Sequence, residues 1–279
     1  MELPKGKLIA IGGNEDKGIV RPGSILRDHQ DTFETGILKR ILSEIGKDDL
    51  RLAVITTASS IPEEVGENYK QAFSRLGCKN VNVLHIKTRE DTLNPEWLEE
   101  IKNVHGVLFT GGDQIRLSMI FGGTEFLEIL YERYEKEEGF LIAGTSAGAM
   151  AMGNNMIYMA DRYKVNITSG LGFIKNVILD THFINRKRFA RLARTVASNP
   201  SCFGIGLGED TGVVITNGNM IETIGSDMIV IFDGHSIKHT NIDHVKDSTP
   251  LSIENLIVHV LSRGNCYCLQ ERKFFIQKV

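Results

Sequence analysis

This sequence of 279 residues has no excess of one charge sign, few cysteines and no long apolar run. Its 32 lysines and arginines nearly balance 35 aspartates and glutamates, so no basic surface for nucleic acid is predicted. No stretch approaches the roughly 18 to 20 apolar residues that cross a bilayer, and insertion into a membrane is excluded. The apolar run from Leu8 to Ile11 is too short for a signal-peptide core, which predicts a cytoplasmic protein.

The cysteines are too few and too scattered for a zinc site. One C-x-C pair is present without a second pair to complete the ligand set, so reduced, buried thiols are predicted and no metal or other cofactor. The four residues are Cys78, Cys202, Cys266 and Cys268. Apolar residues make up 42% of the chain, which is enough for a folded core, and we expect a single α/β domain over residues 1–279.

The first 150 residues alternate short apolar runs with amphipathic stretches of helical length. This alternation is typical of a parallel sheet with helices on both faces. Strands are predicted over residues 7–12, 50–56, 81–86, 106–110 and 140–144. Helices with apolar residues at i, i+3 and i+4 are predicted over 31–45, 64–76, 94–103 and 124–137.

Beyond residue 170 the pattern changes to strands and hairpins. Strands are predicted over 175–179 and 204–207, with a basic helix over 185–197 between them. Asn217-Gly218 and Asp233-Gly234 supply the positive φ values of tight turns, which predicts two hairpins, 212–224 and 228–239. A helix over 252–262 and a hairpin over 267–277 complete the chain. We expect the hairpins to extend the main sheet, and their exposed edges favour a homodimer.

Residues 144–148 read Gly-Thr-Ser-Ala-Gly, directly after an apolar strand and before small residues that suit a helix. A sharp turn in this setting pushes a serine hydroxyl out of the sheet, and the following helix presents free N–H groups. Ser146 is therefore a candidate nucleophile. The alternative is a glycine-rich turn in which the serine only caps a helix.

A second glycine-rich turn, residues 110–114, follows a neighbouring predicted strand. Ligands of open α/β sheets bind beyond the carboxyl ends of strands, so this turn should face Ser146. The Gly112 or Asp113 N–H could join the Ala147 N–H as an oxyanion hole, and Gln114 could orient substrate. The alternative is a tight turn in which Asp113 caps a helix.

His182 also follows a predicted strand, where it could reach Ser146 as a general base. Such a base needs a carboxylate to fix its tautomer. Glu209, at another strand end, is preferred for this role, and Asp161 in a less regular segment is the alternative. The basic residues that follow the histidine could bind carboxylates or form a solvated helix face; they are Arg186, Arg188 and Arg191.

Together these segments resemble the family of serine peptidases that comprises cyanophycinases and dipeptidase E. The resemblance is carried by residues 9–17, 109–114, 144–149, 180–183 and 206–211. It implies an α/β fold with a mostly parallel sheet sandwiched by helices, similar to class I glutamine amidotransferases, with added C-terminal β-hairpins. It also implies Ser146 as nucleophile, His182 as base and Glu209 as acid. The residues implied to line the substrate cleft are Gln114, Asp180, Thr181, Arg186, Arg188 and Arg191.

Within the family, Glu209, the arginines and the C-terminal hairpins resemble cyanophycinases more than the shorter dipeptidase. Cyanophycinases cleave cyanophycin, a poly-aspartate with arginine on its β-carboxyls, into β-Asp-Arg dipeptides. We therefore expect cyanophycin or an aspartyl-arginine peptide as substrate, with Asp180 receiving the substrate guanidinium. Thr181 stands where family members often have glutamine. The alternatives are a dipeptidase for short aspartyl or isoaspartyl peptides and a non-catalytic protein that binds a small anion.

Overall fold

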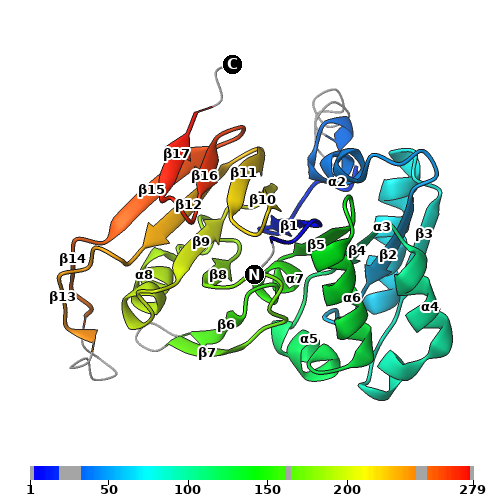
Figure 1. The fold of residues 1–279 in the computed structure, drawn as a ribbon, viewed down its shortest axis with the longest axis horizontal. Helices are drawn as coiled ribbons and strands as arrows, with labels where there is room; N and C mark the ends of the chain where they lie inside the picture. Colours follow the sequence, from blue (N-terminus) through cyan, green and yellow to red (C-terminus); the bar gives the residue numbers. More distant parts are fainter. Residues whose placement is uncertain (1–2, 19–32, 161–164, 243–249, 277–279) are drawn as a thin grey trace.

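The computed structural model describes residues 3–18, 33–160, 165–242 and 250–276 (Figure 1). Its largest sheet has nine strands, of which five neighbouring ones are parallel, as the alternating pattern predicts. In spatial order they are β1 (Lys7–Ile11), β5 (Leu141–Thr145), β4 (Gly106–Phe109), β2 (Arg51–Ile55) and β3 (Asn80–Leu84). The predicted α/β fold class is confirmed.

Helices cover both faces of the parallel strands, because alternate residues of β1 point into two different apolar cores. Ile9 and Ile11 pack in the core beneath α2 and α3, whereas Leu8 and Ala10 pack in the core beneath the helices from α4 to α6. The bounds are α2 Ile37–Ile45, α3 Pro62–Arg75, α4 Pro95–Asn103, α5 Gln114–Phe121 and α6 Glu125–Lys136, with a 3-10 turn η1 at Glu90–Leu93. The beginning of the predicted helix 31–45, residues 31 and 32, lies outside the described residues.

Antiparallel strands extend the main sheet beyond β1. The predicted Asn217-Gly218 hairpin is confirmed, and its first strand pairs with β1. The predicted C-terminal hairpin is confirmed as well and adds the last two strands. These four strands are β10 (Thr211–Thr216), β11 (Met220–Gly225), β16 (Cys266–Cys268) and β17 (Lys273–Phe275).

A second sheet of four strands corrects the expectation that every late hairpin joins the main sheet. Its order is β15-β12-β9-β8, with β8 and β9 parallel and the others antiparallel. The bounds are β8 Val177–Asp180, β9 Phe203–Leu207, β12 Met228–Asp233 and β15 Ile257–Ser262. Helix α8 (Phe189–Ser198) connects β8 to β9 and packs on this sheet (Figure 1).

Two local predictions in this region were wrong. The predicted helix 252–262 is instead β14 (Ile253–Glu254) followed by β15, because burial along β15 alternates with a period of two residues. The predicted hairpin 228–239 does not form, since β12 pairs with β9 and β15 while β13 (His239–Thr240) pairs with β14. The chain turns at His235 and Ser236 instead, where the Ile237 N–H donates to the Gly234 carbonyl at 3.1 Å, and neither Asp233 nor Gly234 has the predicted positive φ.

Two further elements border the candidate site. The hairpin of β6 (Asn155–Ala160) and β7 (Val165–Ser169) was not predicted, and α7 (Ala147–Met150) is the single helical turn after Ser146.

All four cysteines are free, three of them buried and Cys266 half-buried. Across the described ranges, no helix is long and apolar enough to cross a bilayer.

Candidate active site

Three chain segments meet at the turn that follows β1, here called the β1 turn (residues 12–17). Consecutive backbone carbonyls, the last of β1 and the first two of the turn, each accept an N–H group from a different candidate segment. The bonds are Ser146 N–H to Ile11 at 2.9 Å, His182 N–H to Gly12 at 2.8 Å and Asp210 N–H to Gly13 at 2.9 Å. One short stretch of backbone therefore sets the relative positions of all three segments.

Ser146 occupies the sharp turn between β5 and α7, with φ 50° and ψ −110°. A Cβ at Gly148 would lie 2.2 Å from the Phe109 carbonyl oxygen, so only glycine lets α7 approach β4 this closely. A Cβ at Gly111 would lie 3.3 Å from the Ser146 Cβ, so the predicted glycine-rich turn does face the serine. This strained strand-to-helix geometry is that of a nucleophile elbow.

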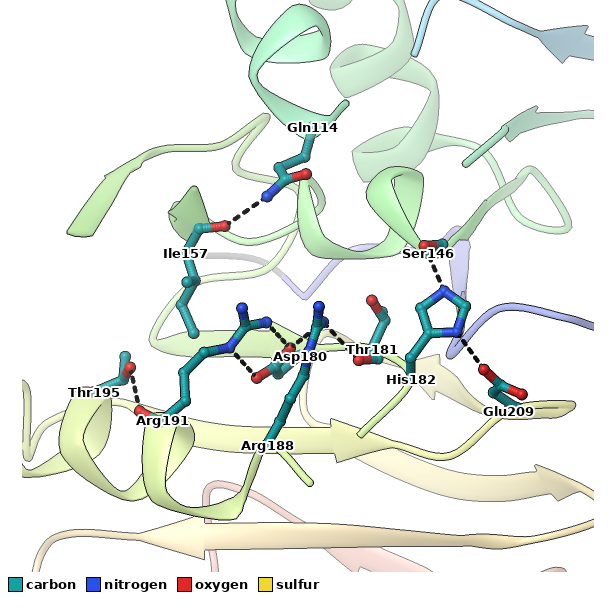
Figure 2. A network of polar contacts seen from close by, with 10 residues as sticks. All are labelled: Gln114, Ser146, Ile157, Asp180, Thr181, His182, Arg188, Arg191, Thr195 and Glu209. Carbon is teal, nitrogen blue, oxygen red and sulfur yellow. Dashed lines mark hydrogen bonds and ion pairs between the residues drawn. The ribbon is translucent and has the colours of Figure 1, made fainter. Parts of the chain in front are cut away.

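A continuous hydrogen-bond chain runs through the three predicted residues (Figure 2). Ser146 Oγ lies 3.0 Å from His182 Nε2, and His182 Nδ1 lies 2.7 Å from Glu209 Oε1. Because an ionised carboxylate only accepts hydrogen bonds, Nδ1 carries the proton and Nε2 is free to accept from the serine. The serine comes from the main sheet, whereas the histidine and the glutamate follow β8 and β9 of the second sheet.

The electrostatics of Glu209 favour the charged carboxylate. The neighbouring Asn14 amide and the hydrogen bond with His182 hold the pKa of Glu209 below its ordinary value. The His182 side chain is only 7% exposed, while that of Glu209 is 26% exposed. Glu209 therefore stays ionised at neutral pH and can stabilise an imidazolium at His182.

Strained backbone conformations are concentrated at this site. Non-glycine residues with positive φ are uncommon, and four of them come from the three segments and the β1 turn: Asn14, Ser146, His182 and Asp210. Gly13 has φ 101°, and a Cβ there would lie 2.5 Å from the His182 ring. Such strain persists only where the surrounding structure fixes it, and it clusters at functional sites.

The glycine-rich turn at residues 110–114 corrects one expectation. The Asp113 N–H donates to the Ala58 carbonyl at 2.9 Å, so it is not available as an oxyanion donor. The Asp113 side chain instead caps α5 by accepting the Ile115 N–H, which was the alternative interpretation. Among the described residues, no acceptor binds the Gly112 N–H, and the Ala147 N–H at the first position of α7 has no acceptor within that helix.

Two of the three candidate arginines, Arg188 and Arg191, form an ion-pair cluster with Asp180 beside the histidine (Figure 2). Asp180 is fully buried; its Oδ1 accepts from Arg188 Nη1 at 3.0 Å and from Arg191 Nη2, and its Oδ2 accepts from Arg191 Nε at 2.8 Å. Arg188 Nη1 also donates to the Thr181 carbonyl at 2.8 Å. With both oxygens bound inside the protein, Asp180 does not receive a substrate guanidinium, contrary to expectation. Thr181 is itself buried, whereas Arg186 is exposed.

The remaining candidates lie at the edge of the site. Gln114, the first residue of α5, donates from Nε2 to the Ile157 carbonyl of β6 at 3.0 Å (Figure 2). Asp161, the alternative acid, lies outside the described residues. Sequence reasoning assigned no role to Glu15, although a buried glutamate in the β1 turn contacts Thr145, the neighbour of Ser146. The signal in the sequence was an acidic residue shortly after an apolar strand, separated from it by Gly12, Gly13 and Asn14.

The sequence also matches a known protein family. The profile of peptidase family S51 matches residues 24–223, more than half of the chain. The chain belongs to peptidase family S51. It is a serine peptidase, and the predicted relationship is confirmed.

Named relatives and solved structures agree with this membership. The cyanophycinase of Trichormus variabilis is 34% identical over 277 residues, which cover 97% of this chain and 88% of that protein. The cyanophycinase of Synechococcus elongatus is 34% identical over 273 residues, covering 95% and 80%. A peptidase from an acI-B1 Actinobacterium has a similar fold, with a TM-score of 0.67, 23% identity and coverage of 96% and 98%. A putative peptidase E protein from Listeria monocytogenes gives a TM-score of 0.52 at 16% identity, covering 81% of this chain and all of that one.

Proposed function

We propose that this S51 peptidase hydrolyses cyanophycin and releases β-Asp-Arg dipeptides. The observation that carries the proposal is the contact between the arginine cluster and the hydrogen-bond chain: Arg188 donates to the carbonyl of Thr181, the residue before His182. The relatives named cyanophycinase, aligned over nearly the whole chain, support the same substrate.

The charges of the cluster suit this polymer. Two guanidinium groups, of Arg188 and Arg191, share the single carboxylate of Asp180, which leaves excess positive charge beside His182. Exposed Arg186 adds to it. Each arginyl branch of cyanophycin keeps a free carboxylate, and arginine binds carboxylates through paired N–H donors. Asp180 then holds two arginines in position and is not assigned a contact with substrate.

In the proposed reaction, Ser146 Oγ attacks the scissile carbonyl carbon while His182 Nε2 takes the hydroxyl proton. The C–N bond then breaks, and the departing amine takes that proton from His182. A water molecule, deprotonated by the same nitrogen, hydrolyses the ester on Ser146. Glu209 accepts the hydrogen bond from His182 Nδ1–H throughout, and the N–H groups of Ala147 and Gly112 stabilise the negative charge on the carbonyl oxygen.

The test is incubation of the purified protein with purified cyanophycin, followed by identification of the products by mass. We expect β-Asp-Arg from the wild type and none from Ser146→Ala at equal concentration, with both proteins giving the same circular dichroism spectrum. Release of the dipeptide by Ser146→Ala would contradict the serine assignment. Hydrolysis of short aspartyl or isoaspartyl dipeptides with the polymer left intact would replace the proposed substrate by that of a dipeptidase.

Two further predictions stand beside the proposed substrate. The edge strands β15 and β17 favour a homodimer, and Val260 on β15 is 57% exposed. Light scattering coupled to gel filtration measures the mass of the particle and tests this prediction. A cytoplasmic location is tested by fractionating cells that express the chain.

A further inference from the structure

The β1 turn contains a buried carboxylate that the proposed reaction does not use. Glu15 is 4% exposed, and its side-chain oxygens accept hydrogen bonds from three donors. Thr145 Oγ1 donates at 2.6 Å, Lys17 Nζ at 2.8 Å, and the Tyr69 hydroxyl donates as well. Three donors on one carboxylate fix its orientation, which a single contact does not.

One of these donors belongs to the strand that carries the serine. Thr145 is the last residue of β5, buried at 3% exposure, and Ser146 follows it directly in its strained conformation. The Thr145–Glu15 hydrogen bond therefore connects the nucleophile strand to the β1 turn by a side-chain contact. Asn14 is the only residue between Glu15 and Gly13, whose carbonyl accepts the Asp210 N–H. The side-chain contact with Thr145 therefore lies close to the backbone bonds of the turn.

The same turn determines where the histidine segment and the acid segment lie. The Gly12 carbonyl accepts the His182 N–H, and the Gly13 carbonyl accepts the Asp210 N–H. A further bond runs from the Asp16 N–H to Asp210 Oδ1 at 3.2 Å. A shift of the turn relative to β5 would change the distance from Ser146 to His182.

From these contacts we propose that Glu15 is a positioning residue, which locks the β1 turn against Thr145 and so fixes the distance between Ser146 Oγ and His182 Nε2. The proposal rests on the catalytic roles proposed above for Ser146 and His182, and it does not depend on the identity of the substrate. A displacement of about 1 Å between reacting groups is enough to slow a reaction about a hundredfold.

Thr145→Val tests the hydrogen bond between Thr145 and Glu15, because valine has nearly the shape of threonine but lacks the hydroxyl that donates to Glu15. Thr145→Ser keeps the hydroxyl and serves as the conservative rescue. Thr223→Val is the matched control: Thr223 is fully buried in β11, and its Oγ1 has no hydrogen-bond partner in the described part of the chain. The first readout is the rate at which a fluorophosphonate reagent labels Ser146, which needs no substrate. The second is kcat and KM on whichever substrate the wild type hydrolyses.

We expect Thr145→Val to label about ten- to a hundredfold more slowly than the wild type, with kcat lowered and KM unchanged. Thr145→Ser and Thr223→Val should label at nearly the wild-type rate. Glu15→Gln should also slow labelling, and the double variant Glu15→Gln with Thr145→Val should be no slower than the slower single variant. If the fold decreases in labelling rate of the two single variants multiplied in the double variant, the two residues would act separately, and the proposal would be overturned.

The positioning role of Glu15 would also be overturned if Thr145→Val were labelled at the wild-type rate. The same holds if Thr223→Val lost as much of its labelling rate as Thr145→Val. If the wild type is labelled at Ser146 but leaves cyanophycin intact, the proposed substrate fails and the role of Glu15 stands. A wild type that is not labelled at Ser146 would overturn the proposed nucleophile and, with it, the role of Glu15.

Discussion

The side chains of Ser146 and His182 approach to 3.0 Å although they follow strands of two different sheets. Ser146 follows β5 of the main sheet, and His182 follows β8 of the smaller sheet. Their separation depends on how the two sheets pack, and the β1 turn contacts both segments. Changes in that turn, or in the groups that orient His182, should therefore alter activity more than stability.

Glu209→Gln should lower kcat about a thousandfold without unfolding the protein. A neutral amide neither stabilises the imidazolium nor selects the tautomer that leaves Nε2 free for Ser146. The measurement is steady-state hydrolysis together with thermal unfolding. Glu254→Gln is the matched control, because Glu254 lies 3.7 Å from His239 on an exposed edge strand. Similar losses in both variants would contradict the role of Glu209.

Gly13→Ala should abolish most of the activity. The added Cβ would lie 2.5 Å from His182 Cε1, and alanine would also have to adopt φ 101°. Gly77→Ala separates the two effects, since Gly77 has φ 97° and a Cβ there would meet no atom within 4 Å. We expect both variants to lose about 1 kcal/mol to backbone strain. Only Gly13→Ala should lose activity, at least a hundredfold, as measured by labelling of Ser146.

Asp180→Asn should destabilise the fold by about 3 kcal/mol, because it leaves the half-buried Arg188 and Arg191 without their shared carboxylate. Urea unfolding measures the change. Glu132→Gln removes one partner of an exposed pair with Lys136 and should leave the unfolding midpoint unchanged. We also expect a higher KM in Asp180→Asn, since the two arginines lose their fixed positions. An unchanged KM would argue against these arginines as substrate ligands.

The stability of the protein should fall in acid in part because of Glu15. Burial opposes its charged form, but the Lys17 ammonium and the hydrogen bonds from Lys17, Thr145 and Tyr69 outweigh that effect, so the pKa of Glu15 lies below the ordinary 4.5. A lowered folded-state pKa contributes stability that is present above the unfolded-state pKa and is lost as pH falls through the folded-state value.

Urea unfolding of the wild type and of Glu15→Gln at a series of pH values checks this dependence. The wild type should have the larger free energy of unfolding near about pH 6, and the difference should shrink as pH falls below about 4. A difference that stays constant over this range would contradict the assignment.

The sequence by itself determined the local structure of this protein and the identity of its candidate catalytic groups. The period of apolar residues, the Asn217-Gly218 turn and the glycines around Ser146 depend on interactions within a few residues, and each is confirmed as predicted. The predicted helix at 252–262 was wrong because this segment forms a strand through its pairing with β12, a contact that lies outside the segment itself.

Only the tertiary structure decided which strands share a sheet and which side chains are already bound. The strand β12 pairs with β9 and β15, partners far away in sequence, because its apolar face is buried in the second sheet. In the same sheet, the parallel pairing of β8 with β9 brings Glu209, which follows β9, to His182, which follows β8. The Asp113 N–H is occupied by the carbonyl of Ala58, and the buried Glu15 holds Thr145, the neighbour of Ser146. Contacts of this kind form between distant parts of the chain, and no local pattern encodes them.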